Sequence, residues 1–237
     1  IVLVGSSFIN NAGASALNPG GGSFLVWSGN PANDTRGGLV YNFKQYNAVY
    51  NSSPVLGAGN GFLYIIAPTI TPSLTGVVSK TYDATNVATL TAGNFSNTGA
   101  IDGDTVTLTN SGATYGSVNV GNNINVAATG ISIASATNGS VAVYGYQMSS
   151  TSANANIGRI TAAPLTVRAN NISKTYGQTV VFAGTEFTSS GLQGGQTIGS
   201  VSLSSVGSAS GANVPGSPYA IAASNETGGK FNHANYT

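Results

Sequence analysis

The chain has 237 residues, of which Lys, Arg, Asp and Glu make up 5%, against about 25% in an ordinary globular protein. The net charge is +1, and the seven Lys and Arg residues are scattered from Arg36 to Lys230, so no basic patch is available to bind nucleic acid. The longest apolar runs are far shorter than the roughly 20 residues needed to cross a bilayer. We therefore expect neither nucleic-acid binding nor membrane insertion.

The chain has no cysteine, which removes disulfides, thiolate metal sites and cysteine nucleophiles together. It begins with the apolar run Ile1–Val4, without an initiator Met or a charged leader region. We expect it to be a segment of a longer protein.

Residues 1–67 are predicted to form a β-rich segment. Short strands are expected at Ile1–Val4 and Phe8–Asn11, and a stronger strand at Ser23–Ser28, followed by a loop over residues 30–38. Trp27 is the only tryptophan, and its large apolar ring predicts a small local core around it.

A repeated motif organises the rest of the chain. The run Ser79-Lys80-Thr81-Tyr82-Asp83 returns as Ser173-Lys174-Thr175-Tyr176-Gly177, 94 residues later. This period is far longer than the roughly 20–50 residues of solenoid repeats and close to the length of a small β-sandwich. The prediction is an all-β chain in which the N-terminal segment 1–67 is followed by two tandem Ig-like β-sandwich modules, 68–163 and 164–237.

Strands in the first module are predicted from period-two alternation and from the turn residues between the runs. No segment has a sustained helical period. The expected strands are Val77–Tyr82, Val87–Leu90, Thr105–Thr109, Ser117–Val120, Ile124–Ala127, Gly130–Ala134, Val141–Met148 and Ile157–Ala162.

The second module contains no counterpart of the strand Ile157–Ala162, so it is predicted to lack its last strand, and the natural chain is expected to continue past Thr237. The modules join without a linker. Pro164 restricts Ala163 to extended conformations, which predicts a stiff junction.

The repeated motif itself is predicted to be structural. Tyr82 and Tyr176 are expected to be buried, with their hydroxyls bonded to backbone. An alternative for Lys80 and Lys174 is an intramolecular isopeptide bond to an Asn, which requires a neighbouring buried acid.

Asp102 and Asp104 form the best acidic pair and are a weak candidate for a calcium site. Calcium takes six to eight oxygen ligands, whereas this loop offers two carboxylates, so capping of a hairpin turn is the favoured interpretation. We expect no metal and no cofactor.

No catalytic residues are predicted. His233 is the only histidine and is expected in a turn or on the surface, and no Gly-x-Ser-x-Gly elbow is present. The chain is therefore expected not to be an enzyme.

Several segments resemble a known family. Phe8–Gly13, Phe24–Ser28 and Asn42–Asn47 resemble the place where the β-helical shaft of filamentous-haemagglutinin-like exoproteins gives way to modular repeats. The first motif, Ser79–Asp83, resembles the opening of a YDG domain, and Ser173–Gly177 resembles that of an MBG domain in its YGX form. In the YDG signature a Gly usually follows the Asp, but here Ala84 takes its place.

This resemblance implies a very large secreted bacterial protein, exported by two-partner secretion through an outer-membrane transporter and acting as an adhesin, biofilm component or surface fibre. Its partners would be neighbouring repeats, identical subunits in a fibre, the transporter during export, and a surface glycan or host receptor. The absence of cysteine suits a chain that is threaded unfolded. The competing prediction is a glycan-binding module that uses exposed Asn, Asp and tyrosines, for which the candidates are Tyr41, Tyr46, Tyr50 and Tyr115.

Overall fold

The protein is described by a computed structural model that covers residues 1–237. It is nearly all β, with 39% of residues in strands and no helix of seven or more residues, so the predicted fold class is confirmed. No helix has the length and apolar character needed to span a membrane. The helical elements are 3-10 turns: η1 (Pro31–Asn33), η2 (Ala92–Asn94), η3 (Val206–Ser208), η4 (Val214–Gly216) and η5 (His233–Asn235).

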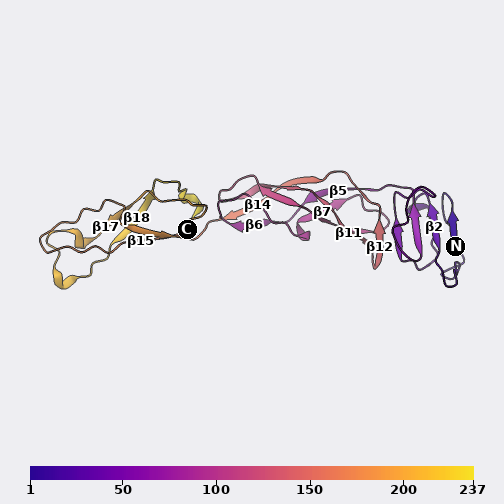
Figure 1. Cartoon of the computed structure of the whole chain (residues 1–237), viewed down its shortest axis with the longest axis horizontal. Coiled ribbons are helices and arrows are strands. Elements are labelled where there is room, and N and C mark those ends of the chain that lie inside the picture. Colours follow the sequence, from indigo (N-terminus) through magenta and orange to yellow (C-terminus); the bar gives the residue numbers. More distant parts are fainter. The chain divides into compact units, whose positions relative to one another are not determined.

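A seven-stranded sheet begins near the N-terminus and runs in the order β1-β2-β4-β3-β12-β11-β8. Its strands are β1 (Val2–Val4), β2 (Leu25–Ser28), β3 (Phe43–Gln45), β4 (Gly61–Tyr64), β8 (Thr105–Thr109), β11 (Ser132–Asn138) and β12 (Val141–Tyr144). Figure 1 labels β2, β12 and β11 in this part of the chain.

The first five strands of this sheet pair in parallel, although long loops separate them in the sequence. Stacked rungs of a β-helical shaft pair in the same way. The rungs do not follow chain order, however, because β4 lies between β2 and β3. Strand β12 then pairs with β3, so a strand of the first module extends the sheet of the N-terminal segment.

Aromatic and aliphatic side chains fill the space beside these rungs. Trp27, Phe43, Ala48 and Leu63 form one buried cluster, which confirms the local core predicted around Trp27. Phe62 is also fully buried and makes edge contacts with other rings. Full burial of a large side chain such as Phe43, Phe62 or Leu63 stabilises the fold by roughly 1.5–3 kcal/mol.

Two further sheets belong to the first module, ordered β6-β14-β10-β9 and β13-β5-β7. Their strands are β5 (Thr69–Leu74), β6 (Val78–Thr81), β7 (Phe95–Thr98), β9 (Gly112–Tyr115), β10 (Gly121–Thr129), β13 (Gln147–Met148) and β14 (Ser152–Thr161).

Strand predictions in the first module are partly confirmed. The predicted strand Thr105–Thr109 coincides with β8, whereas β5, β7 and β9 were not expected. Strand β5 has alternating burial but contains Pro72, a residue that argues against a strand because it cannot donate to a ladder.

The predicted strands Val87–Leu90 and Ser117–Val120 do not form. The second of these alternates like a strand in sequence, but its backbone is held differently: the Val120 N–H donates to Asn235 Oδ1 at 2.9 Å. A side-chain amide therefore replaces a neighbouring strand as its partner.

Contacts divide the chain into two compact units. The first unit holds residues 1–78, 88–114 and 125–157, and the second holds 79–87, 115–124 and 158–237. Strands β10 and β14 each have residues in both units. Because these units cut across the sequence repeat, the domain bounds drawn from that repeat remain a prediction.

The second unit contains two two-stranded antiparallel sheets. They are β15 (Thr166–Ala169) with β16 (Phe187–Ser190), and β17 (Ser200–Ser204) with β18 (Ala222–Thr227). Residues 235–237 lie alongside Ala163 and Leu165: the Thr237 N–H donates to the Ala163 carbonyl, and the Leu165 N–H to the Thr237 carbonyl, both at 2.9 Å.

Gly145 gives a direct test of how tightly β12 is held against the N-terminal segment. Its φ is +86°, and a Cβ added there would lie 2.0 Å from the Tyr46 carbonyl oxygen. We expect Gly145→Ala to lower the free energy of unfolding by about 3 kcal/mol, from left-handed strain and overpacking together. Urea unfolding of the whole chain measures this.

Gly139→Ala is the matched control. Gly139 also has a positive φ, +58°, but an added Cβ would meet nothing within 4 Å. We expect a loss of only about 1 kcal/mol, from backbone strain alone. Equal losses in the two variants would contradict the close approach at Gly145.

Candidate functional site

The first unit contains a buried charge cluster, made of Arg36, Lys44, Asp102 and Asp104. Lys44 lies in β3, between β4 and β12, and its side chain is 0% exposed. Its Nζ lies 2.6 Å from Asp102 Oδ2 and also donates to Oδ1 of Asp104, a side chain that is likewise 0% exposed. Burying a single unpaired charge in this interior would cost much free energy. The Lys44 cation and the two carboxylates must therefore be buried together.

Asp104 is held by neutral donors as well. Its Oδ2 accepts from the Tyr46 hydroxyl at 2.7 Å and from the Tyr146 hydroxyl at 3.0 Å, while Asn138 Nδ2 donates to Oδ1 at 3.0 Å. Both carboxylate oxygens therefore have partners, as a buried acid requires.

The two tyrosines remain protonated in this setting. Burial raises the pKa of Tyr46, and its hydrogen bond to Asp104 raises it further. Burial also raises the pKa of Tyr146, to about 12. Both hydroxyls therefore act as donors to Asp104 at neutral pH.

Asp102 sits at the edge of the cluster, with 21% of its side chain exposed. Its Oδ2 lies 2.5 Å from Arg36 Nη2, and Arg36 also donates to the hydroxyls of Tyr64 and Tyr41. Burial opposes ionisation of Asp102, but its hydrogen bonds with Arg36 and Lys44 outweigh this and hold its pKa below the usual range. Asp102 is therefore a carboxylate at neutral pH.

Asp102 and Asp104, the weak candidates for a calcium site, are surrounded by cations and hydroxyl groups. Their oxygens face a lysine, an arginine and two phenol hydroxyls, and no three His, Cys, Asp or Glu side chains gather anywhere in the structure. The pair does border a turn, because Asp102 and Gly103 both have positive φ, and Asn138 Nδ2 donates to the Asp102 carbonyl.

The first repeat motif forms a clamped turn in the second unit. Lys80 Nζ bonds to Asp83 Oδ1 and to the Thr85 carbonyl, both at 2.7 Å, and Asp83 Oδ1 accepts from the Thr85 N–H. Ala84 has a φ of +63°, a conformation that glycine adopts at the lowest cost. This explains why a glycine suits that position in the YDG signature.

Tyr82 is buried as predicted, but its hydroxyl bonds to a side chain instead of backbone. It accepts from Gln196 Nε2 at 2.7 Å, and Gln196 Oε1 accepts from the Tyr236 hydroxyl at 2.6 Å. The rings of Tyr82 and Tyr236 meet edge to face at 5.4 Å.

The second motif keeps the lysine clamp and loses the buried ring. Lys174 Nζ donates to the Gln178 carbonyl at 2.8 Å and to the Ala209 carbonyl. Tyr176 is 63% exposed, so its predicted burial is wrong. Residues 170–186 form no strand, so this tyrosine has no sheet to pack against.

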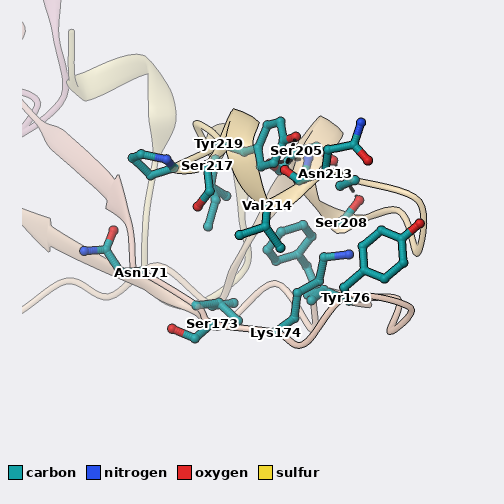
Figure 2. Close-up of a pocket in the computed structure, with 17 residues that line it drawn as sticks. Asn171, Ser173, Lys174, Tyr176, Ser205, Ser208, Asn213, Val214, Ser217 and Tyr219 are labelled. Atoms are coloured by element: carbon teal, nitrogen blue, oxygen red, sulfur yellow. Dashed lines mark hydrogen bonds between the residues drawn. The ribbon is translucent and has the colours of Figure 1, made fainter.

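A surface groove of about 560 Å³ lies beside this motif, with Lys174 and Tyr176 at one end and Asn171 at the other (Figure 2). Both polar and apolar side chains line it. It is lined by Asn171, Ile172, Ser173, Lys174, Tyr176, Val180, Phe182, Ser205, Gly207, Ser208, Ala212, Asn213, Val214, Ser217, Pro218, Tyr219 and Ile221.

The tyrosines proposed as glycan platforms differ in exposure. Tyr46 and Tyr115 are buried, so their predicted exposure is wrong. Tyr41 is half-buried under Arg36, and only Tyr50 is exposed, with its ring edge-on to Trp27. The groove beside Tyr176 was not foreseen, because residues 171–221 come together only in the fold.

The repeat region matches two known families. Residues 67–157 match the YDG domain, and residues 165–237 match the MBG domain of the YGX type.

The chain carries a YDG domain followed by an MBG domain. The two domains fit an adhesin-like repeat protein. Neither a curated protein nor a solved structure matches the chain.

These matches place the elements of the site. The charge cluster joins Arg36 and Lys44, which precede the YDG domain, to Asp102 and Asp104 within it. The groove lies entirely in the MBG domain. His233, the only histidine, is in the MBG domain with 76% of its side chain exposed, and its one charged neighbour is Glu226 at 3.9 Å.

Replacing Lys44 tests how much the charge cluster contributes to the free energy of unfolding. Lys44→Met removes the cation and leaves Asp104 buried without it, so we expect the free energy of unfolding to fall by about 3–5 kcal/mol. Lys230→Met removes an exposed charge of the same sign and should change it by less than about 0.5 kcal/mol. Urea unfolding compares the two, and similar losses would contradict a stabilising role specific to Lys44.

Proposed function

We propose that this chain is a non-enzymatic structural and adhesive segment of a large secreted bacterial surface protein of the filamentous-haemagglutinin-like type. It serves as stalk or filament scaffold. The observation that carries the proposal is the YDG domain followed after seven residues by the MBG domain, with a buried ion cluster that fastens the preceding segment to the YDG domain.

The contacts of the acidic groups support a role in which no external substrate is turned over. All six acidic side chains bond or pair within the chain. Their contacts are with lysine, arginine, histidine, hydroxyl or backbone N–H groups: Asp34, Asp83, Asp102, Asp104, Glu186 and Glu226.

Location and export follow from the same proposal. The protein would reach the cell surface through an outer-membrane transporter and meet neighbouring repeats, copies of itself, or a surface receptor there. A chain without cysteine forms no disulfide before or during passage, and its packed sheets form on the outside.

Single-molecule pulling on the whole chain tests the scaffold role. A load-bearing chain should extend in discrete unfolding steps at measurable force, because each packed core yields cooperatively. A Gly/Ser chain of the same length is the control and should extend smoothly. Smooth extension of the protein itself would contradict the proposal.

Glycan binding is the second candidate function, and the MBG groove favours it. An exposed tyrosine stands beside asparagine and serine groups, which together can stack on a sugar face and bond to its hydroxyls. In this version the groove gives the segment its adhesive contact.

A glycan array probed with the whole chain tests this second function. Where a glycan binds, Tyr176→Ala should weaken it about tenfold or more, the equivalent of 1.4 kcal/mol. Tyr50→Ala removes another exposed tyrosine, outside the groove, and should leave binding unchanged. Equal effects of the two substitutions, or no bound glycan at all, would reject the groove as the adhesive site.

A further inference from the structure

The groups around Asp104 are those that amide formation between two side chains requires. Such a reaction needs an amine beside a carboxyl carbon, donors for the oxygen that gains charge, a base for the amine protons, and little water. Lys44 and Asp104 meet with both side chains 0% exposed, and the side chains of Asp102, Tyr46, Tyr146 and Asn138 bond to their amine or carboxylate.

We propose that Lys44 Nζ and Asp104 Cγ become joined by an isopeptide bond within the folded chain. Asp102 accepts the protons of the amine, and the hydroxyls of Tyr46 and Tyr146 stabilise the oxyanion that forms on Asp104. These three are then catalytic residues of a reaction that the chain performs once on itself.

The nucleophile and the electrophile are already in contact. Lys44 Nζ donates to Asp104 Oδ1, so the amine reaches Cγ with a small rotation of either side chain. Strand β3 holds Lys44 between two neighbouring strands, and Asn138 Nδ2 fixes Oδ1 from the other side. Holding the two groups together in this way replaces a collision in solution by a step within one molecule.

Two hydroxyl groups donate to the oxygen of Asp104 that becomes the oxyanion. The hydroxyls of Tyr46 and Tyr146 lie 2.7 and 3.0 Å from Asp104 Oδ2, which is the spacing that stabilises a tetrahedral oxyanion. Both belong to aromatic rings packed at 5.0 Å from one another, which fixes their direction.

The base is Asp102, whose Oδ2 is 2.6 Å from Lys44 Nζ. It is the one carboxylate of the cluster with an exposed portion, 21% of its side chain, so it connects the buried amine to solvent. Arg36 holds it in place from the outer side.

The atoms balance without any co-reactant. Lys44 begins as an ammonium with three protons and Asp104 as a carboxylate. The Nζ–Cγ bond forms and the Cγ–Oδ1 bond breaks; one proton stays on the amide nitrogen, and two pass by way of Asp102 to Oδ1, which leaves as water. Asp102 ends in the state in which it began.

The lysines of the repeat motif do not meet these conditions. Asp83, the acid beside Lys80, has 47% of its side chain exposed. Lys174 donates only to backbone carbonyls. The chemistry considered for Lys80 and Lys174 from the sequence therefore fits Lys44 better, because only Lys44 is fully buried against carboxylates.

The intact mass of the purified whole chain, measured after denaturation, tests whether the isopeptide bond has formed. We expect it to be lower than the sequence mass by one water molecule. Lys44→Arg keeps a cation at this position but lacks the amine, and its mass should equal its own sequence mass. A folded wild-type chain at full sequence mass would overturn the proposal.

Peptide mapping locates the bond. Trypsin does not cut after an acylated lysine, so the digest should contain residues 37–80 linked to residues 81–159, and free peptide 37–44 should be lost. A mass deficit confined to any other pair of peptides would overturn the assignment to Lys44 and Asp104.

Two further variants test the chemistry. Asp104→Asn retains a carbonyl carbon but releases ammonia, so its mass should fall below its own sequence mass by one ammonia instead of one water. Asp102→Asn retains the shape of the cluster without the base, and the bond should form at least about tenfold more slowly. An unchanged rate would remove Asp102 from its role.

Discussion

The first unit depends on one contact, in which the fully buried Lys44 lies between the partly exposed Asp102 and the fully buried Asp104. Desolvating a charged group costs several kcal/mol, and attraction between opposite charges offsets this only when the geometry is close and every remaining oxygen is bonded. Here the tyrosine hydroxyls and Asn138 supply those bonds. Because cation and acids come from segments about sixty residues apart in sequence, neither the N-terminal rungs nor this edge of the YDG domain is complete alone.

The two copies of the repeat motif show which part of it carries structure. In both, the lysine Nζ bonds to a backbone carbonyl four or five residues onward and so closes a turn. Tyrosine burial is not shared: Tyr82 packs against Tyr236, whereas Tyr176 has no such neighbour and faces solvent at the groove. The feature that both copies share is therefore the lysine-closed turn, and burial of the tyrosine ring occurs only in the first copy.

Local pattern was sufficient to predict the all-β class, the core around Trp27 and the strand at β8, because alternation and turn residues act over short distances. The charge cluster could not be predicted in this way. The only signals were a lysine inside the aromatic run of residues 41–50 and two acids in one loop, within a chain that has few charges. Neither signal predicts that the lysine and the acidic loop are in contact, because this contact depends on the parallel pairing of β12 with β3. Tyr46 was misplaced on the surface for the same reason.

The charge cluster uses a large share of the few charged residues in the chain. Four of the thirteen Lys, Arg, Asp and Glu residues bond to one another within the first unit, so nine remain for the rest of the chain. Few charged side chains are therefore available to attract a partner electrostatically. An ion cluster also differs from a disulfide in its timing. It requires the folded sheet to bring residues 44 and 104 together, so the fastening arises only when folding is complete.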